Sequence, residues 1–142
     1  MRMSRRLANL ISLVVLLACT GSHPIEIENA WIREINPSQS VTAGYLTLTN
    51  TGTADDRLMS VSTAAYRVVE LHTMAVNEQG VMKMRKSGPI AVPSGGSVEL
   101  KRGSYHLMLI EPQYAITAGN DVPLTLVFEK SGETTVAARV RK

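Results

Sequence analysis

The chain has 142 residues, of which 44% are hydrophobic, and a formal net charge of +3. This length suits one domain with one modest core. The excess positive charge comes from Arg2, Arg5 and Arg6, and the rest of the chain holds 12 basic and 12 acidic residues. A neutral domain offers no charge argument for nucleic-acid binding, and we expect none.

The first 18 residues have the pattern of a secretory signal peptide. The three arginines precede an apolar run from Leu7 to Ala18, and such a charged start followed by a short apolar run is typical of export signals. A permanent membrane helix is the alternative, but a spanning helix needs about 20 apolar residues. We therefore predict that residues 1–18 are a signal peptide of the lipoprotein type.

Cys19 is the only cysteine of the chain and follows this run directly. The segment from Leu16 to Cys19 resembles a bacterial lipobox, which predicts lipidation of Cys19, a tether over 19–24 and anchoring to the membrane through the lipid alone. Ordinary signal removal with an incidental Cys19 stays open. With one cysteine there is no internal disulfide, and any soft metal ligand other than thiolate must be methionine.

From residue 25 onward, short runs alternate between apolar and polar residues and are broken by Gly, Pro, Asn, Asp and Ser, with no sustained helical repeat. This pattern predicts an all-β domain over 25–142, a β-sandwich of two packed antiparallel sheets. Trp31, Tyr45 and Phe128 are expected in its core, and Asp55 to Arg57 in a turn with a local ion pair. The nine expected strands are 25–33, 43–50, 57–62, 68–74, 81–86, 97–100, 106–110, 123–129 and 134–140.

Methionine and histidine are concentrated in one stretch of 37 residues, from His72 to Met108. Because successive side chains of a strand point to opposite faces, His72 and Met74 share a face, as do Met82 and Met84, and His106 and Met108. In each case the neighbouring apolar residues form the inward set. Three strands therefore direct imidazole or thioether groups away from the core, at the positions His72, Met74, Met82, Met84, His106 and Met108.

Exposed methionine gains nothing from water, so this face is expected to contact a ligand. Copper(I) suits it, because soft thioethers select copper(I) and imidazole binds it well. A purely structural role for these residues also stays open, because methionine commonly fills gaps in cores and a histidine in a strand is often a packing residue. Met74 and Met82 in particular are compatible with flanking or packing roles.

The order His72, Met84, His106, Met108 resembles the metal motif of the PCu(A)C family of periplasmic copper chaperones. The His-x-Met pair and the 21 residues between Met84 and His106 agree with that motif. Eleven residues separate His72 from Met84, where the family usually has ten. If this extra residue shifted the strand register by one, Met84 would leave the shared face. The resemblance covers nearly the whole mature chain, including 30–31, 43–50, 56–58, 69–72, 80–85, 105–109 and 124–129.

The resemblance implies a cupredoxin-like β-sandwich that binds copper(I) through His72, Met84, His106 and Met108. Met74 and Met82 are possible accessory ligands that could replace Met84 if it left the shared face. The resemblance implies a periplasmic metallochaperone without catalytic activity, and the lipobox adds the lipid anchor at Cys19. The implied acceptor is the binuclear copper centre of a respiratory haem-copper oxidase or its assembly factor. No second copper site is expected, although His23 in the tether could contribute weakly.

Three other functions are the rivals of copper transport. A blue-copper electron carrier requires a cysteine ligand, which the domain lacks. A hydrolase is disfavoured because no nucleophile motif is recognisable. A metal-free structural or partner-binding lipoprotein domain, in which the methionine face contacts another protein, remains the alternative.

Overall fold

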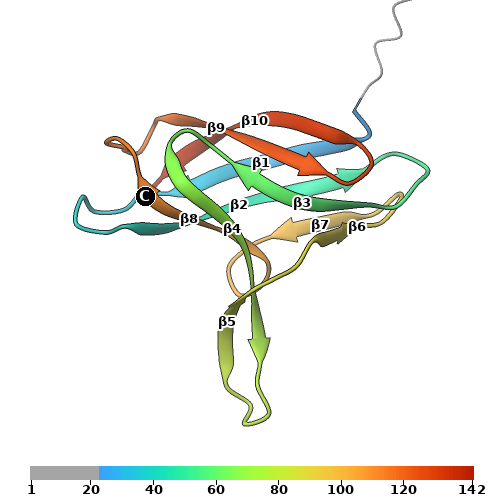
Figure 1. The fold of residues 1–142 in the computed structure, drawn as a ribbon, viewed down its shortest axis with the longest axis horizontal. Helices are drawn as coiled ribbons and strands as arrows, with labels where there is room; N and C mark the ends of the chain where they lie inside the picture. Colours follow the sequence, from blue (N-terminus) through green and yellow to red (C-terminus); the bar gives the residue numbers. More distant parts are fainter. Residues whose placement is uncertain (1–22) are drawn as a thin grey trace, which may run out of the picture.

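The computed structural model describes residues 23–142, which fold into ten β-strands without a helix (Figure 1). Nine of the ten strands match the expected ones, with ends displaced by no more than two residues. The strands are β1 (Ile25–Arg33), β2 (Val41–Asn50), β3 (Asp56–Ser62), β4 (Tyr66–Val76), β5 (Met82–Lys86), β6 (Ile90–Val92), β7 (Ser97–Leu100), β8 (His106–Pro112), β9 (Asp121–Phe128) and β10 (Gly132–Arg141).

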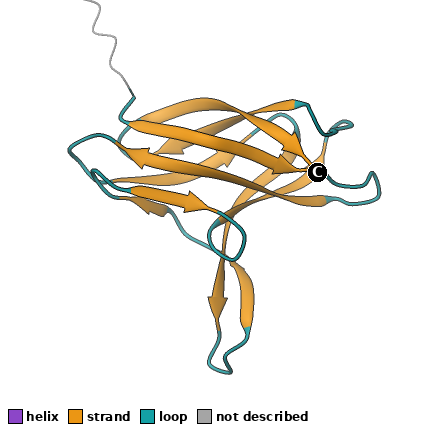
Figure 2. Ribbon diagram, turned by 180° about the vertical axis from the view of Figure 1, so that it is seen from behind, coloured by secondary structure: helices purple, strands orange, loops and turns teal. Residues whose placement is uncertain are grey.

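The strands form one continuous hydrogen-bonded sheet, which folds over into two layers, and not two separate sheets. Its order is β5-β4-β8-β2-β1-β10-β9-β3-β6, and β7 pairs with β2 off this path. At the far end of the path β6 comes back beside β2 and β7, so the strands lie in two layers around one core (Figure 2). The all-β sandwich expected from the sequence is confirmed.

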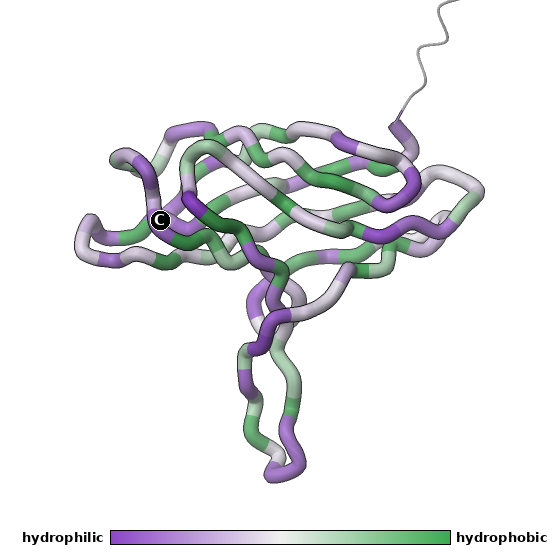
Figure 3. The backbone as a smooth tube through the Cα atoms, viewed as in Figure 1, coloured by the Kyte–Doolittle hydropathy of each residue, from purple (hydrophilic) through white to green (hydrophobic). Residues whose placement is uncertain are grey.

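Alternation along the strands builds the core between the layers, as the colouring of Figure 3 illustrates. Leu46 and Leu48 of β2, Leu107 and Leu109 of β8, and Leu124 of β9 are essentially inaccessible to solvent. Burying a side chain of this kind stabilises the fold by about 1.5–3 kcal/mol. The residues between these positions belong to the other face of their strands, which places His106 and Met108 of β8 opposite the core face.

Three details of the fold differ from the expectation. The short strand β6 was missed because three residues between Pro89 and Pro93 give too little alternation to recognise. β1 and β10 pair in parallel, so the sandwich is not wholly antiparallel. Trp31 is half-buried on the outer face, where its ring packs on Tyr45 at 4.7 Å between centroids. The β1–β2 pairing places both rings on the side opposite the core residues Ile32 and Leu46.

Asp56 is not part of an exposed turn but a buried carboxylate, 4% accessible, that binds the β9–β10 turn. It accepts hydrogen bonds from the backbone N–H groups of Arg57, Lys130 and Ser131 and from the Ser131 hydroxyl. Arg57 pairs instead with Glu129 on the adjacent strand end, through two hydrogen bonds of 2.8 Å. The expected local ion pair is therefore wrong.

The outer parts of β4 and β5 form a hairpin that projects from the sandwich (Figures 1 and 2). β5 is an edge strand, and all five of its residues are exposed. The N-terminal end of the described chain lies on the opposite side of the sandwich from this hairpin (Figures 1 and 2). The hairpin thus points away from the N-terminal end of the domain.

Candidate metal centre

The candidate ligands lie on the neighbouring strands β5, β4 and β8, and the strand register brings them to one face. His72 of β4 is directly opposite His106 of β8, and Met74 of β4 is directly opposite Met84 of β5. Met108 is opposite Glu70, two residues before His72. Because paired residues share a face and every second residue does too, all five side chains belong to the same side of the sheet.

The hairpin turn keeps Met84 on this face in spite of the extra residue before it. The pairing runs from His72–Lys86 to Val76–Met82 without a shift, and residues 77–81 form the connection. The Asn77 side chain accepts hydrogen bonds from the backbone N–H groups of Gln79 and Val81, and Gly80 has a φ of +76°. Asn and Gly are the residues that accommodate such turns. The additional residue is absorbed in the turn, not in the strand.

The two imidazole rings are close enough for a single metal ion to bind both. Their centroids are 5.9 Å apart and the ring planes are inclined by 48°. A metal–nitrogen bond of about 2 Å places the ion about 3 Å from each centroid, so one ion can join rings whose centroids are up to about 6 Å apart. The observed separation is just inside that limit.

The site is less exposed than the sequence suggested. His106 is only 4% accessible, and the side chain of His72 is 12% accessible. Met84 and Met82 are 49% and 53% accessible, whereas Met74 and Met108 are partly buried. The expectation of a surface patch thus holds for the hairpin methionines and not for the histidines.

Each histidine has one ring nitrogen in a hydrogen bond and one without a partner. His72 Nε2 is 2.9 Å from Glu70 Oε2, and His106 Nδ1 is 3.0 Å from the carbonyl oxygen of Ser104. The other nitrogens, His72 Nδ1 and His106 Nε2, are buried and make no hydrogen bond within residues 23–142. A buried polar atom without a partner is costly, and a missing metal ligand is one accepted explanation for it.

Glu70 is the main charged group beside the histidines. Its hydrogen bond with His72, together with the bond of 2.7 Å from Lys86 Nζ, lowers the pKa of its carboxyl, although desolvation opposes the shift. Sequence reasoning did not include Glu70, Lys86 or Ser104. Alternation does place Glu70 on the face of His72, but the contribution of Lys86 depends on the hairpin register and that of Ser104 on a loop conformation.

Methionine supplies the soft donors that share a face with the two histidines. In the described part of the chain, no three or more His, Cys, Asp or Glu side chains gather in a way that could hold a metal ion. Two imidazoles alone form an incomplete site for most divalent metals, whereas two imidazoles with nearby thioethers form a soft donor set. The arrangement therefore favours copper(I) over a hard cation such as calcium or magnesium.

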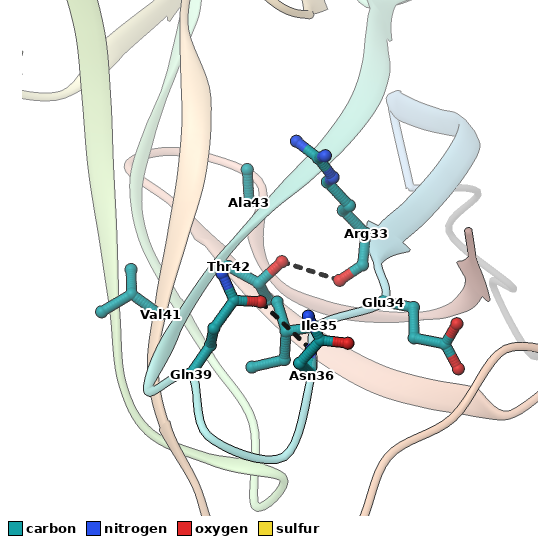
Figure 4. Close-up of a pocket in the computed structure, with 8 residues that line it drawn as sticks. All are labelled: Arg33, Glu34, Ile35, Asn36, Gln39, Val41, Thr42 and Ala43. Carbon is teal, nitrogen blue, oxygen red and sulfur yellow. Dashed lines mark hydrogen bonds between the residues drawn. The ribbon is translucent and has the colours of Figure 1, made fainter.

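Other hollows of the surface lie away from these residues. The one in Figure 4 is lined by residues of the β1–β2 connection and its flanks, among them Arg33, Asn36 and Gln39. There the Thr42 hydroxyl donates a hydrogen bond of 2.7 Å to the Arg33 carbonyl oxygen. No candidate ligand lines this hollow. His23 is likewise separate from the cluster, because its ring packs on Phe128 at 5.7 Å between centroids.

A small β-sandwich with one buried and one largely buried histidine, and with methionines on the same face, is typical of a soft-metal-binding domain. The comparisons agree. Residues 25–140 match the family described as "Putative lipoprotein LpqE-like", and the chain belongs to this family. The chain is 32% identical to protein RP573 of Rickettsia prowazekii over 102 residues, which cover 71% of this chain and 56% of that protein. The chain thus corresponds to little more than half of that relative.

Solved structures that are similar to this chain include copper-bound domains. The copper-bound PCuAC domain from PmoF2 superposes with a TM-score of 0.70 at 28% identity and covers 83% of this chain and 92% of its own. The solution structure of CuI-DR1885 from Deinococcus radiodurans gives a TM-score of 0.66 at 28% identity, with 88% and 83% covered. The PCu(A)C resemblance seen in the sequence is confirmed.

A second curated relative, "Putative lipoprotein Lxx21020" of Leifsonia xyli, is 26% identical over 82% of this chain and 69% of its own length. The names of this relative and of the family support a lipoprotein. The predicted signal peptide and Cys19 lie outside the described residues. Within residues 23–142, no helix has the length and apolar character to span a membrane.

Proposed function

We propose that this protein is a copper(I) metallochaperone that holds one ion with His72, Met84, His106 and Met108. The observation that carries the proposal is the pair of buried, unpartnered ring nitrogens on rings 5.9 Å apart. Met84 and Met108 share their face of the sheet. Met74, directly opposite Met84, and Met82 are accessory donors that can take the ion during loading or release.

The proposed location is the periplasm, with the domain anchored through a lipid on Cys19 after removal of residues 1–18. The position of the hairpin supports this arrangement, because the hairpin projects from the side of the sandwich opposite the N-terminal end of the described chain (Figure 1). A tether over 19–24 then leaves the methionines directed away from the membrane and toward soluble or membrane-bound partners. Two acyl chains or more make such anchoring stable.

Delivery proceeds by ligand exchange rather than catalysis. Met84 is 49% accessible, whereas His106 is 4% accessible, so an acceptor reaches the thioether first and the imidazoles last. The acceptor that we propose is the binuclear copper centre of a respiratory haem-copper oxidase, or an assembly factor that serves it. Comparing the copper content and activity of that oxidase in cells with and without this protein tests the assignment of the acceptor.

Copper(I) binding is tested by competition with a chromogenic copper(I) chelator. The wild-type domain is expected to withdraw one equivalent of copper, and His106→Ala or Met108→Leu to abolish tight binding while the β-sheet circular dichroism stays unchanged. Met59→Leu is a matched control, since Met59 is also exposed, at 41%, but lies on β3. Wild-type affinity in both site variants contradicts the ligand set. No binding by the wild-type domain instead favours the metal-free, partner-binding lipoprotein.

A further inference from the structure

The two histidines of the candidate centre are held by different kinds of acceptor through different ring nitrogens. The Ser104 carbonyl oxygen can only accept, so His106 Nδ1 carries a proton and donates the 3.0 Å bond. The Lys86 ammonium donates a hydrogen bond of 2.7 Å to Glu70 Oε1, so Glu70 is paired with a cation and acts as a carboxylate, which only accepts. His72 Nε2 therefore carries a proton and donates the 2.9 Å bond to Glu70 Oε2.

A neutral imidazole has one protonated nitrogen and one free lone pair, and only the lone pair binds a metal. The hydrogen bonds thus leave the lone pair on Nδ1 in His72 and on Nε2 in His106. These are the same two atoms that are buried without a partner. The ligand assignment therefore rests on the two hydrogen bonds that are made, and the burial of the remaining nitrogens agrees with it.

We infer that copper(I) is bound by Nδ1 of His72 and Nε2 of His106, and that Glu70 is the positioning residue that sets the tautomer of His72. This inference rests on the proposed copper(I) site and adds the ligand atoms and a role for a residue outside the motif. Glu70 is not a ligand. Its second oxygen accepts a hydrogen bond of 2.7 Å from Lys86 Nζ, so the carboxylate is fixed from both sides.

The position of Lys86 ties this arrangement to the hairpin. Lys86 is directly opposite His72 in the β4–β5 register, and Met84 is two residues earlier on the same face. Strand β5 therefore carries both the exposed thioether of Met84 and the ammonium group of Lys86, which holds the Glu70 carboxylate in place. Hydrogen bonds to the second nitrogen of a metal-binding histidine fix its orientation and raise its basicity, and their loss typically costs 10–100-fold in metal affinity.

The test is nitrogen-15 NMR of histidine-labelled protein, without metal and with one equivalent of copper(I). Without metal, His72 is expected as the Nε2–H tautomer and His106 as the Nδ1–H tautomer. With copper(I), the metal-dependent shifts are expected at His72 Nδ1 and His106 Nε2. Copper-bound signals at Nε2 of both histidines, or a His72 that carries its proton on Nδ1 in the metal-free protein, would overturn the inference.

Variants of Glu70 separate positioning from simple loss of charge. Glu70→Leu is expected to give a mixture of His72 tautomers and a 10–100-fold weaker copper(I) affinity, with the His106 signals unchanged. Glu70→Gln keeps an acceptor for Nε2–H and is expected to restore the Nε2–H tautomer. Glu99→Leu is the control, because Glu99 also faces a lysine, Lys101 at 3.6 Å, and has no histidine partner.

The outcomes distinguish this inference from the proposed function. A wild-type domain that binds copper(I) with other nitrogens, or a Glu70→Leu variant with unchanged tautomer and affinity, refutes the inference and leaves the copper chaperone standing. A wild-type domain that binds no copper(I) refutes both. Weaker binding by Glu70→Leu, recovered in Glu70→Gln with the tautomer, supports the inference.

Discussion

Replacing Asp56 by Asn is expected to destabilise the fold in a way that depends on pH. Asp56 is 4% accessible and its carboxylate accepts three backbone N–H bonds of 2.8–2.9 Å in addition to the Ser131 hydroxyl. Burial by itself raises the pKa of this carboxyl, but the hydrogen bonds from Ser131, Lys130 and Arg57 outweigh it and lower the pKa from 3.8 to about 2.

The magnitude follows from linkage between protonation and folding. Each pKa unit corresponds to about 1.4 kcal/mol, so the ionised Asp56 contributes about 2 kcal/mol to the free energy of unfolding. Because the pKa is lower in the folded state, this contribution is complete above the unfolded-state pKa near 3.8 and is lost as the pH falls toward about 2. Asn accepts with only one oxygen, which leaves a donor of the turn unsatisfied at every pH and adds about 1–3 kcal/mol.

The assay is urea unfolding of the wild type and Asp56→Asn between pH 2 and pH 7, followed by circular dichroism. The difference in unfolding free energy is expected to be about 3–5 kcal/mol at pH 7, from the two contributions together, and smaller by about 2 kcal/mol near pH 2. Glu129→Gln is the control, since that carboxylate is exposed and paired with Arg57. A difference between wild type and Asp56→Asn that does not change with pH would refute the reasoning.

The remaining predictions concern the core, the hairpin turn and the surface. Leu107 lies between His106 and Met108 and has no solvent exposure. Leu107→Ala is expected to lower the unfolding free energy by about 2–5 kcal/mol, while the protein that stays folded still binds copper(I). Loss of copper(I) binding without destabilisation contradicts this prediction. Gly80→Val forces a β-branched residue to a φ of +76° and is expected to cost about 1–2 kcal/mol in thermal unfolding, whereas Gly80→Asn is tolerated. Arg57→Met removes an exposed ion pair and is expected to change stability by less than about 1 kcal/mol in the same measurement; a larger loss disproves its surface character.

Much of the fold could be predicted because it depends on period-two alternation, which is local. Leu107 and Leu109 occupy the core because every second residue of their strand is apolar. The same alternation correctly separated His106 and Met108 from them as a second face. Where alternation was short, as in 90–92, or where an aromatic ring packs outside the core, as in Trp31, the local pattern was insufficient.

The candidate site could be predicted only in part. The sequence identified which strands carry soft donors and, through the family motif, which four of them to consider. It could not decide whether the extra residue before Met84 shifts the strand register. The register depends on the conformation of the turn, where Asn77 accepts a hydrogen bond from the N–H group of Val81 and Gly80 has a positive φ. It also did not reveal Glu70 as the partner of His72, since a glutamate on an outer face is usually solvated.

Composition and periodicity therefore determined the all-β class, the core residues and the grouping of histidine and methionine, because each depends on neighbours along the chain. The tertiary structure alone decided the 5.9 Å approach of the two imidazoles, their burial and the nitrogen left free on each ring. Those properties arise where β4 meets β8, whose paired residues His72 and His106 are 34 positions apart in the chain. Contacts between segments so distant leave no periodic trace in the sequence of either one.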